Sequence, residues 1–239
     1  MLTEESLCTA ELKINFPSSQ VIIAALNEEE GIAPTIVEMK SNLGGAKILV
    51  VDGGSTDHTV EVAKDLGAEI AFQDRSGKGD ALAKAIEYAD LNVDYIVITD
   101  ADFTYPAKYV PEMVRILEEN LDVGMVCGNR FNGHVDPKAL HSVFYFGNRL
   151  LAFTHNLLNG IPLCDPLTGL RVVRASILQN WKVRSKGFDF EVELNHRVER
   201  KGFGILEIPI KYRERLGEKK LGMRHGAEIL KRILLETTY

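Results

Sequence analysis

Apolar runs and helical patterns alternate along the first half of the chain. The apolar runs, rich in β-branched residues, cover 21–26, 48–51, 69–72 and 95–99. Helical apolar spacing follows each run, over 31–41, 57–66, about 80–88 and 108–119. Short apolar runs of this kind favour strands that are buried on both faces. The alternation therefore predicts an α/β fold with right-handed βαβ crossovers, a mostly parallel sheet and helices on both of its faces.

The second half of the chain is less regular but continues the mixture of strands and helices. We expect strands over 123–127 and 204–210 and helices over 141–158, 188–200 and 227–235. A turn-rich loop over 165–171 leads into a further short strand. Residues 1–19 are polar and mixed, and we interpret them as an N-terminal extension with an edge strand around 12–16. Residues 20–239 then form a single domain, divided near residue 130 into two halves.

Two carboxylates directly follow the fourth apolar run. Asp100 and Asp102 are separated by one small residue, and Pro106 then ends the extended segment. The carboxyl end of a strand in an open α/β sheet is where ligands bind. Two hard oxygen ligands beside open space suit Mg²⁺ or Mn²⁺, which take carboxylates together with substrate phosphates. The alternative is that Asp102 only caps the helix that follows.

Polar residues also follow the other three predicted strands, and parallel strands bring them to the same rim. Asn27 and Glu28 follow the first strand, and Asp52 follows the second, within a glycine-rich turn. An aspartate in such a turn can accept hydrogen bonds from a base or a ribose. Lys78 stands at the start of the third helix, where an anion is favoured. A solvated surface lysine is the alternative.

Positive charge is concentrated in the second half of the chain. The segment 213–224 contains five cations and is interrupted by Gly217 and Gly222, which suggests a loop able to close over an anion. Further arginines of the second half stand at 130, 149, 171 and 174. The alternative is that this run of cations is simply a charged surface exposed to solvent. Acids at the strand ends of one half and cations in the other suit a metal–diphosphate donor and an anionic acceptor.

Composition and missing motifs exclude several classes of protein. The 239 residues carry a net charge of -6, which argues against wholesale nucleic-acid binding. The three cysteines are widely spaced without a CxxC, so they indicate neither a disulfide framework nor a zinc site and fit a reducing cytosol. No signal peptide and no apolar run of about 18 residues is present. Walker A, GxGxxG, GxSxG and HExxH motifs are absent as well.

Several segments together resemble a known family. Residues 21–30, 50–57, 77–82 and 99–102 resemble the GT-A glycosyltransferases of family 2. Residues 165–171, 187–194 and 215–221 are similar to the polyprenyl- and dolichyl-phosphate sugar transferases, which include dolichol-phosphate mannose synthase. The resemblance extends from about residue 21 to residue 235. It implies a GT-A (Rossmann-like) fold with a nucleotide-sugar half over 20–130 and an acceptor half over 131–239, the latter forming a C-terminal extension.

The resemblance also implies an activity and a set of site residues. The activity is inverting, metal-dependent transfer of one sugar from a GDP-mannose or UDP-glucose/GlcNAc type of donor to dolichyl or polyprenyl phosphate. The nucleotide-sugar would contact Asn27, Glu28, Asp52, Lys78 and Asp100. Asp100 and Asp102 would hold Mg²⁺ or Mn²⁺, and the catalytic residues would be Asp102, Arg130 and Arg215. The acceptor phosphate would contact Arg149, Arg171, Lys220 and Arg224.

A lipid acceptor implies contact with a membrane. We expect a protein at the cytoplasmic face of a membrane, attached through the amphipathic segments 141–158 and 227–235 or through a separate membrane subunit. Core packing of those two segments is the alternative. A phosphate acceptor, already ionised near neutral pH, needs no general base.

Three other functions are compatible with parts of the pattern. A family 2 enzyme acting on a sugar hydroxyl, in glycan or polysaccharide synthesis, would need a carboxylate base, for which Asp165, Asp189 and Glu191 are candidates. A nucleotidyltransferase would share the α/β layout, but the glycine-rich loop typical of that class is absent after the first strand. A non-catalytic binding module would not require the acidic pair and the basic segment together.

Overall fold

The computed structural model describes residues 17–131, 143–218, 220, 222 and 224–237. Its strands are β1 (Ser19–Ala25), β2 (Lys47–Asp52), β3 (Glu69–Phe72), β4 (Tyr95–Asp100), β5 (Val123–Asn129), β6 (Arg171–Arg174) and β7 (Gly204–Pro209). Its α-helices are α1 (Glu29–Asn42), α2 (Thr59–Asp65), α3 (Lys78–Tyr88), α4 (Val110–Glu119), α5 (Val143–Asn159), α6 (Ala175–Leu178), α7 (Phe190–Arg200) and α8 (Arg224–Glu236). The 3-10 turn η2 covers Ala107–Tyr109 and leads into α4.

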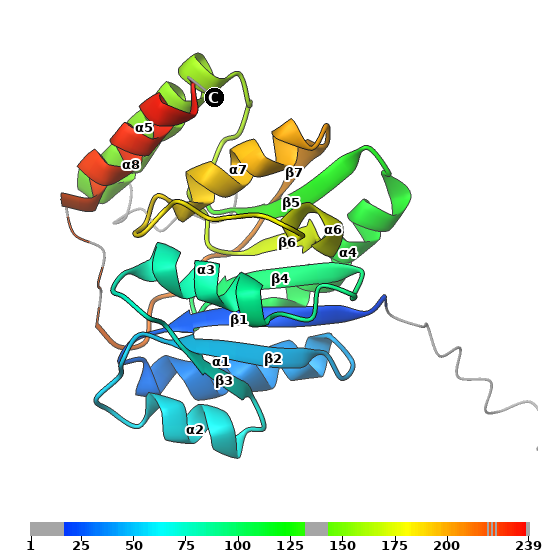
Figure 1. Cartoon of the computed structure of the whole chain (residues 1–239), viewed down its shortest axis with the longest axis vertical. Coiled ribbons are helices and arrows are strands. Elements are labelled where there is room, and N and C mark those ends of the chain that lie inside the picture. Colours follow the sequence, from blue (N-terminus) through cyan, green and yellow to red (C-terminus); the bar gives the residue numbers. More distant parts are fainter. Residues whose placement is uncertain (1–16, 132–142, 219, 221, 223, 238–239) are drawn as a thin grey trace, which may run out of the picture.

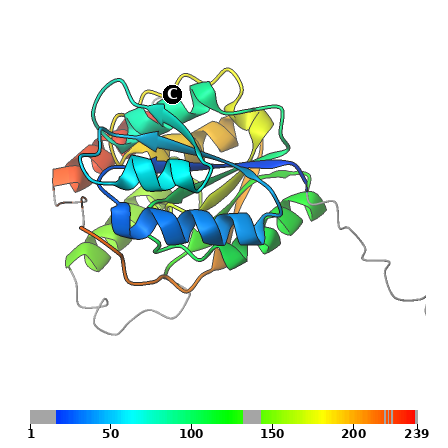
Figure 2. The same ribbon diagram turned by 90° about the horizontal axis from the view of Figure 1, so that it is seen from below.

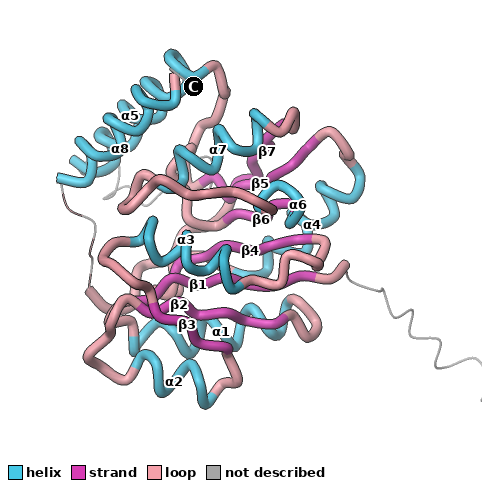
Figure 3. The backbone as a smooth tube through the Cα atoms, viewed as in Figure 1, coloured by secondary structure: helices cyan, strands magenta, loops and turns pink. Residues whose placement is uncertain are grey.

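The described strands form one seven-stranded sheet in the order β3-β2-β1-β4-β6-β5-β7 (Figures 1 and 3). β6 pairs antiparallel with β4 and β5, whereas the other neighbouring pairs are parallel. The predicted α/β fold with a mostly parallel sheet is thus confirmed. Asp52 pairs with Ala25 and Asp100 pairs with Ala24. The carboxyl ends of β1, β2 and β4 are therefore level at one edge of the sheet.

Both faces of the sheet are covered by helices, because the central strands present mainly apolar side chains to both faces. Val21 and Ile23 of β1 face the core beneath α1, α2 and α4, while Ile22 faces the core beneath α3, α6 and α7. All three side chains are completely buried. Figure 2, which looks at the sheet from its edge, shows α1 (blue) on one side of the strands and α3 (teal) on the other. The doubly covered sheet holds the strand ends in fixed positions.

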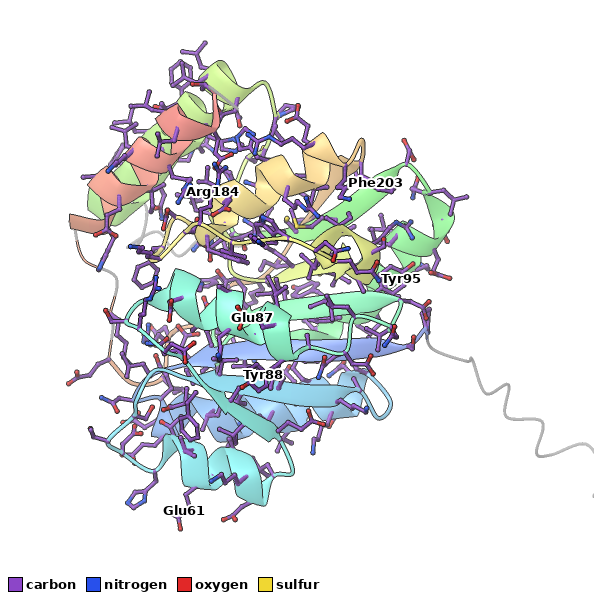
Figure 4. All side chains as sticks on the ribbon, in the orientation of Figure 1. Glu61, Glu87, Tyr88, Tyr95, Arg184 and Phe203 are labelled. Atoms are coloured by element: carbon purple, nitrogen blue, oxygen red, sulfur yellow. The ribbon has the colours of Figure 1, made fainter. Side chains whose placement is uncertain are left out.

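Helices α5 and α8 pack side by side beyond α7, at one corner of the molecule (Figure 1). Ile229 and Ile233 of α8 pack against Val192 of α7 in a third, smaller apolar core. Polar contacts join the same elements: Arg232 bonds Asp189 at 2.8 Å, and the buried Glu236 meets Arg184, Arg200 and Arg232 at 2.8–3.4 Å. Figure 4 labels Arg184 where the segment before α7 passes α8. The α5–α8 pair is thereby fixed to α7 and to the segment before it.

Most predicted elements are present, with shifted ends. The helix expected over 31–41 begins earlier, at Glu29, and the one expected over 57–66 is shorter, Thr59–Asp65. The last helix is longer than expected and covers Arg224–Glu236. The antiparallel direction of β6 and the short helix α6 were not predicted from the sequence. The edge strand expected around 12–16 lies outside the described residues.

Candidate active site

A cleft of about 580 Å³ opens at the carboxyl ends of β1 and β4. This volume lies within the range of about 300–1,000 Å³ that is usual for small-molecule sites. Side chains from both halves of the chain line it, among them Glu28, Lys78, Asp100, Asp102, Arg130, Glu191, Arg215 and Lys220. The predicted convergence of strand ends therefore produces a single charged cleft at the rim of the sheet.

The two carboxylates at the end of β4 have different surroundings. The Asp100 side chain is 28% exposed, whereas that of Asp102 is 7% exposed. Asp102 Oδ1 accepts hydrogen bonds from the backbone N–H and the hydroxyl of Thr104, at 3.1 and 2.6 Å. Its Oδ2 lies 3.2 Å from the Arg215 guanidinium. Burial and the neighbouring Asp100 charge raise the pKa of Asp102, although Thr104 and Arg215 oppose the rise.

Lys78 neutralises two carboxylates of the cleft, those of Asp100 and Glu191. Its Nζ lies 2.7 Å from Asp100 Oδ1 and 2.8 Å from Glu191 Oε1, and its side chain is 14% exposed. Burial by itself would lower the pKa of Lys78, but the two adjacent carboxylates outweigh burial and raise it. The lysine that was expected at a helix start therefore carries a full positive charge inside the cleft.

Glu28 gathers the cations of the basic segment. Its Oε1 accepts from Arg215 and from Lys220 Nζ, the latter at 2.8 Å. Lys220 also donates to the Asn27 carbonyl at 2.6 Å. Burial raises the pKa of Glu28 more than Lys220 and Arg215 lower it. Its Oε2 is buried and has no hydrogen-bond partner among the described residues, so the site retains an unsatisfied hydrogen-bond acceptor beside the end of β1.

The segment that follows β7 crosses the rim of the sheet on its way to α8 (Figure 1). Arg213 N donates to the Thr104 carbonyl at 3.0 Å, and Leu216 N donates to the Asp102 carbonyl at 3.1 Å. The Arg213 guanidinium bonds both carboxylate oxygens of Glu38 on α1, each at 2.7 Å. Backbone and side-chain bonds thus hold this basic segment directly over the acidic pair.

Arg130 follows β5 and forms a paired contact with Asp165. Its Nε and a terminal guanidinium nitrogen lie 2.7 and 2.8 Å from the two carboxylate oxygens, and its backbone N–H donates to the same group at 3.0 Å. The guanidinium also lies 5.6 Å from the ring centre of Tyr212, which meets Tyr105 edge to face at 5.1 Å. Such a bidentate pair fixes the cation at the cleft wall.

Two residues predicted to hold the nucleoside form the loops beside the cleft. The Asn27 side-chain oxygen accepts from Thr56 N at 2.8 Å and so ties the loop after β1 to the loop after β2. The Asp52 carboxylate is 1% exposed and accepts from the backbone N–H groups of Gly54 and Ser55, at 2.7 and 2.9 Å. Direct contact of either side chain with a nucleoside stays a prediction.

The arginines expected to meet the acceptor phosphate are placed differently from one another. Arg149 is an exposed residue of α5, 5.4 Å from the Phe131 ring centre. Arg171 is 1% exposed, and it donates to the Thr168 and Pro166 carbonyls and to Asn195, at 2.9, 2.6 and 2.6 Å. Arg171 begins β6 and pairs with Ile98 of β4 and Cys127 of β5, so its side chain lies within the core. The prediction that Arg171 contacts the acceptor phosphate is therefore withdrawn. The side chain of Arg224 lies outside the described residues.

With the cleft described, comparison with known proteins identifies the family. A model of the family described as glycosyl transferase family 2 matches residues 20–181, more than half of the chain. The chain belongs to glycosyltransferase family 2. The resemblance found in the sequence is therefore confirmed, and the protein is a glycosyltransferase.

Archaeal proteins are among the relatives of this glycosyltransferase. It is 32% identical over 223 residues to the dolichyl-phosphate hexose transferase of Haloferax volcanii, covering 92% of this chain and 93% of that one. It is also 32% identical over 231 residues to the low-salt glycan biosynthesis hexosyltransferase Agl6 of Haloferax volcanii. That alignment covers 93% of this chain and 55% of Agl6.

Solved structures share the fold of this glycosyltransferase. It matches glucosyl-3-phosphoglycerate synthase from Mycobacterium tuberculosis, crystallised with Mn²⁺, UDP and glucosyl-3-phosphoglycerate, with a TM-score of 0.74. The match covers 93% of this chain and 80% of the synthase at 20% identity. The predicted GT-A fold is thereby confirmed. Among the helices in the described ranges, none has the length and apolar character that crossing a bilayer requires.

The cleft of this glycosyltransferase has suitable ligands for a divalent ion. Asp100 and Asp102 offer carboxylate oxygens, and the Lys78 ammonium shows that a cation is accommodated against Asp100. Within the described part of the chain, no three His, Cys, Asp or Glu residues form a group that could hold a metal. Mg²⁺ is usually held by one or two carboxylates together with substrate phosphates and water. The acidic pair fits that mode.

Sequence reasoning did not assign several residues that shape the site. Glu191 was considered only as a base, and its contact with Lys78 depends on α7 packing beside α3. Tyr105 and Tyr212 line the cleft from positions without a recognisable motif. Gly169 was noted only as a turn residue, yet a Cβ there would lie 2.5 Å from Asp100 Oδ2. A glycine in a turn can indicate a close approach between two segments, but the sequence does not show which residue comes close.

Proposed function

We propose that this glycosyltransferase transfers one hexose, with inversion, from a nucleotide-sugar to a polyprenyl or dolichyl phosphate in a reaction that requires Mg²⁺ or Mn²⁺. The observation that carries the proposal is the meeting of acids and cations in one cleft, where Arg215 lies 3.2 Å from Asp102. An acidic pair suits a metal-bound diphosphate, and the cations suit a second anion. The name of the Haloferax relative, dolichyl-phosphate hexose transferase, supports the choice of acceptor.

The donor occupies the half of the cleft formed by β1, β2 and β4. Asn27, Glu28 and Asp52 surround the nucleoside, and Lys78 approaches the diphosphate from the start of α3. Asp100 and Asp102 hold the divalent ion, which supplies charge neutralisation for the departing diphosphate when it is bound. The structural neighbours crystallised with UDP and Mn²⁺ or Mg²⁺ support this assignment, while the base of the donor, uracil or guanine, stays open.

The acceptor phosphate is positioned by cations of the second half. Arg130, Arg215 and Lys220 line the cleft next to the acidic pair and reduce the repulsion between the two anions. The acceptor would enter the cleft past Arg149, a cation on the outer side of α5. A phosphate oxygen then attacks the anomeric carbon on the face opposite the leaving diphosphate, which inverts the configuration.

The carboxylates support a phosphate acceptor rather than a hydroxyl acceptor. A hydroxyl would need a general base, but Asp165 is paired with Arg130, Glu191 with Lys78 and Asp189 with Arg232. A carboxylate paired with a cation at 2.7–2.8 Å is a weak base. A phosphate monoester has a second pKa of about 6, so it is largely ionised near pH 7 and requires no base.

A panel of acceptors tests the proposal. The protein is incubated with radiolabelled GDP-mannose, UDP-glucose or UDP-GlcNAc, with Mn²⁺, and with farnesyl phosphate, farnesol or an alkyl glucoside. We expect transfer from one donor to farnesyl phosphate and at least about 100-fold less product with farnesol, which lacks the anion. Transfer to the alkyl glucoside in preference to farnesyl phosphate would contradict the proposal and support a hydroxyl acceptor.

A further inference from the structure

Glu207 lies on β7, the strand at the edge of the sheet next to β5 (Figure 1). Both of its carboxylate oxygens accept hydrogen bonds from consecutive backbone N–H groups of the segment that connects α5 to β6. Oε2 accepts from Cys164 N and Oε1 accepts from Asp165 N, each at 2.7 Å. Glu207 thus fixes the backbone of this connecting segment at Asp165.

The place of Glu207 in the sheet makes these two bonds necessary. Glu207 pairs in register with Cys127 of β5, which is completely buried. Burial raises the pKa of Glu207, while the bonds from Cys164 N and Asp165 N lower it. A half-buried carboxylate is costly unless its oxygens are hydrogen-bonded. The acid and the segment therefore stabilise each other, and neither moves without loss of these bonds.

Asp165 continues this set of contacts toward the cleft. Its side chain is 1% exposed and bonds the Arg130 guanidinium through Nε and one terminal nitrogen, at 2.7 and 2.8 Å. Within the described ranges, Arg130 has no other ion-pair partner. Of Glu207, Asp165 and Arg130, Arg130 alone lines the cleft. The position of the guanidinium in the cleft therefore depends on where the Asp165 backbone is held.

The other end of the connecting segment is held by different bonds. Gly169 N donates to the Tyr105 hydroxyl at 2.7 Å, and a Cβ on Gly169 would lie 2.5 Å from Asp100 Oδ2. These contacts lie beside the acidic pair and do not involve Glu207. A change at Glu207 should therefore displace Arg130 more than it disturbs the acidic pair.

We propose that Glu207 is a positioning residue for sugar transfer, which fixes the Arg130 guanidinium through Asp165 where the acceptor phosphate binds. Asp165 bonds Nε and one terminal nitrogen of Arg130, so the second terminal nitrogen keeps both of its N–H donors for a phosphate. A displacement of about 1 Å in such a contact can lower a rate about 100-fold. This inference rests on the proposed function, because it takes Arg130 as a contact of the acceptor phosphate.

Kinetics of transfer to farnesyl phosphate test the positioning role. Glutamine in Glu207→Gln keeps the size of the side chain but replaces one accepting oxygen by an NH2 group, which cannot accept from a backbone N–H. We expect the kcat/KM for farnesyl phosphate to fall about tenfold, with the KM for the nucleotide-sugar within about twofold of the wild type. Glu207→Asp, which keeps the charge but shortens the side chain, should show the same difference to a smaller degree.

The matched control is Asp94→Asn. Asp94 also accepts from a backbone N–H, that of Ser18 at 2.9 Å, but it lies before β4, at the end of the sheet opposite the cleft. Its kinetic constants should equal those of the wild type. Circular dichroism and urea unfolding show whether each variant is folded in the assay. An equal fall in kcat/KM for both substrates in folded Glu207→Gln and Glu207→Asp would overturn the inference.

A double-mutant cycle separates positioning from a general structural role. In an Arg130→Met background, Glu207→Gln should change the kcat/KM for farnesyl phosphate by less than about twofold, because the guanidinium that it would displace is absent. The same tenfold loss in both backgrounds would show that Glu207 acts without Arg130 and would overturn the inference.

Chemical modification with phenylglyoxal tests the position of Arg130 without any enzymatic reaction. Mass spectrometry of the modified protein follows Arg130, whose side chain is 17% exposed, with Arg115, 59% exposed, as the internal reference. Arg130 should react at least about fivefold faster in Glu207→Gln than in the wild type, because its site opens more often, while Arg115 reacts at the same rate in both. Equal rates for Arg130 would overturn the inference. Faster modification of Arg130, together with no transfer to farnesyl phosphate by the wild type, would overturn the proposed function and leave the positioning of Arg130 by Glu207 standing.

Discussion

The ε-ammonium of Lys78 lies 2.7 Å from the Asp100 carboxylate inside the cleft. The same ammonium lies 2.8 Å from Glu191, so one cation joins the acidic pair of β4 to an acid of α7. A divalent ion on Asp100 and the Lys78 ammonium would repel each other at such distances. Metal binding and the position of Lys78 are therefore expected to be coupled.

Replacing Lys78 by Ala should change metal binding and turnover in opposite directions. Without the competing ammonium, Mn²⁺ should bind the donor-free protein about three- to tenfold more tightly. Turnover should fall at least about tenfold, because a cation beside the diphosphate is lost. Mn²⁺ binding is measured by electron paramagnetic resonance. Lys84→Ala is the control, since Lys84 lies on the same helix but pairs with Asp74 and Glu87 at the surface. Unchanged or weaker Mn²⁺ binding in Lys78→Ala would contradict the coupling.

Replacing Glu191 by Gln should shift Mn²⁺ affinity in the other direction. Lys78 would then keep Asp100 as its one charged partner and compete more strongly with the metal. We expect Mn²⁺ to bind about three- to tenfold more weakly to the donor-free protein, with the melting temperature recorded to show that the variant is folded. Tighter binding in a folded Glu191→Gln protein would show that Glu191 does not hold Lys78 away from Asp100.

Arg171→Met tests the assignment of Arg171 to the core rather than to the acceptor. Its loss leaves the buried Thr168 carbonyl and the Asn195 side-chain oxygen without this donor, while the Pro166 carbonyl keeps only its bond from Asn195 Nδ2, so the free energy of unfolding in urea should fall by about 3 kcal/mol. The KM for farnesyl phosphate should stay unchanged at a temperature where the variant is folded. Arg115→Met, at an exposed pair with Glu119, should cost less than about 1 kcal/mol. A raised KM without loss of stability would return Arg171 to the acceptor site.

His196 makes the stability depend on pH on the acidic side. Burial, then His155 and Arg200, lower the pKa of His196 to about 4 from an ordinary value of 6.5. A lowered histidine pKa means that the folded state excludes the proton, so its contribution is complete above pH 6.5 and is lost as the pH falls toward 4. Between pH 7.5 and pH 5 the loss should be about 2 kcal/mol. Urea unfolding of the wild type and His196→Gln at both pH values measures it, with the exposed His58→Gln as control. Equal pH dependence in all three proteins would exclude His196 as the cause.

The sequence predicted the parts of the structure that follow from local pattern. Apolar runs located the strands, and the parallel arrangement of β1, β2 and β4 brings Glu28 and Asp100 to one cleft, as the alternation of elements implied. Lys78 lies at a helix start, as the sequence predicted, and its partners here are two side-chain carboxylates; its contact with a nucleotide-sugar stays a prediction.

What the sequence could not predict depends on pairings between distant residues. In the sequence, Arg171 follows a turn-rich loop and resembles an exposed cation. Only the antiparallel position of β6 between β4 and β5 places it in the core. Arg213 belongs to a basic run, but its bonds to Glu38 require α1 to lie beside the segment after β7. In each case, tertiary packing rather than residue type decides whether the cation is available to a ligand.

The most direct test of the central claim is the Mn²⁺ dependence of hexose transfer to farnesyl phosphate in the wild type and in Asp102→Asn. The asparagine keeps the size of the side chain. Burial raises the pKa of Asp102, so removing its charge should leave the variant at least as stable as the wild type. Asp122→Asn, an exposed aspartate, is the control. We predict that transfer depends on Mn²⁺ in the wild type and the control, and falls at least about 100-fold in Asp102→Asn. Transfer by a folded Asp102→Asn protein at the wild-type rate would contradict the claim that the acidic pair of β4 supports the reaction.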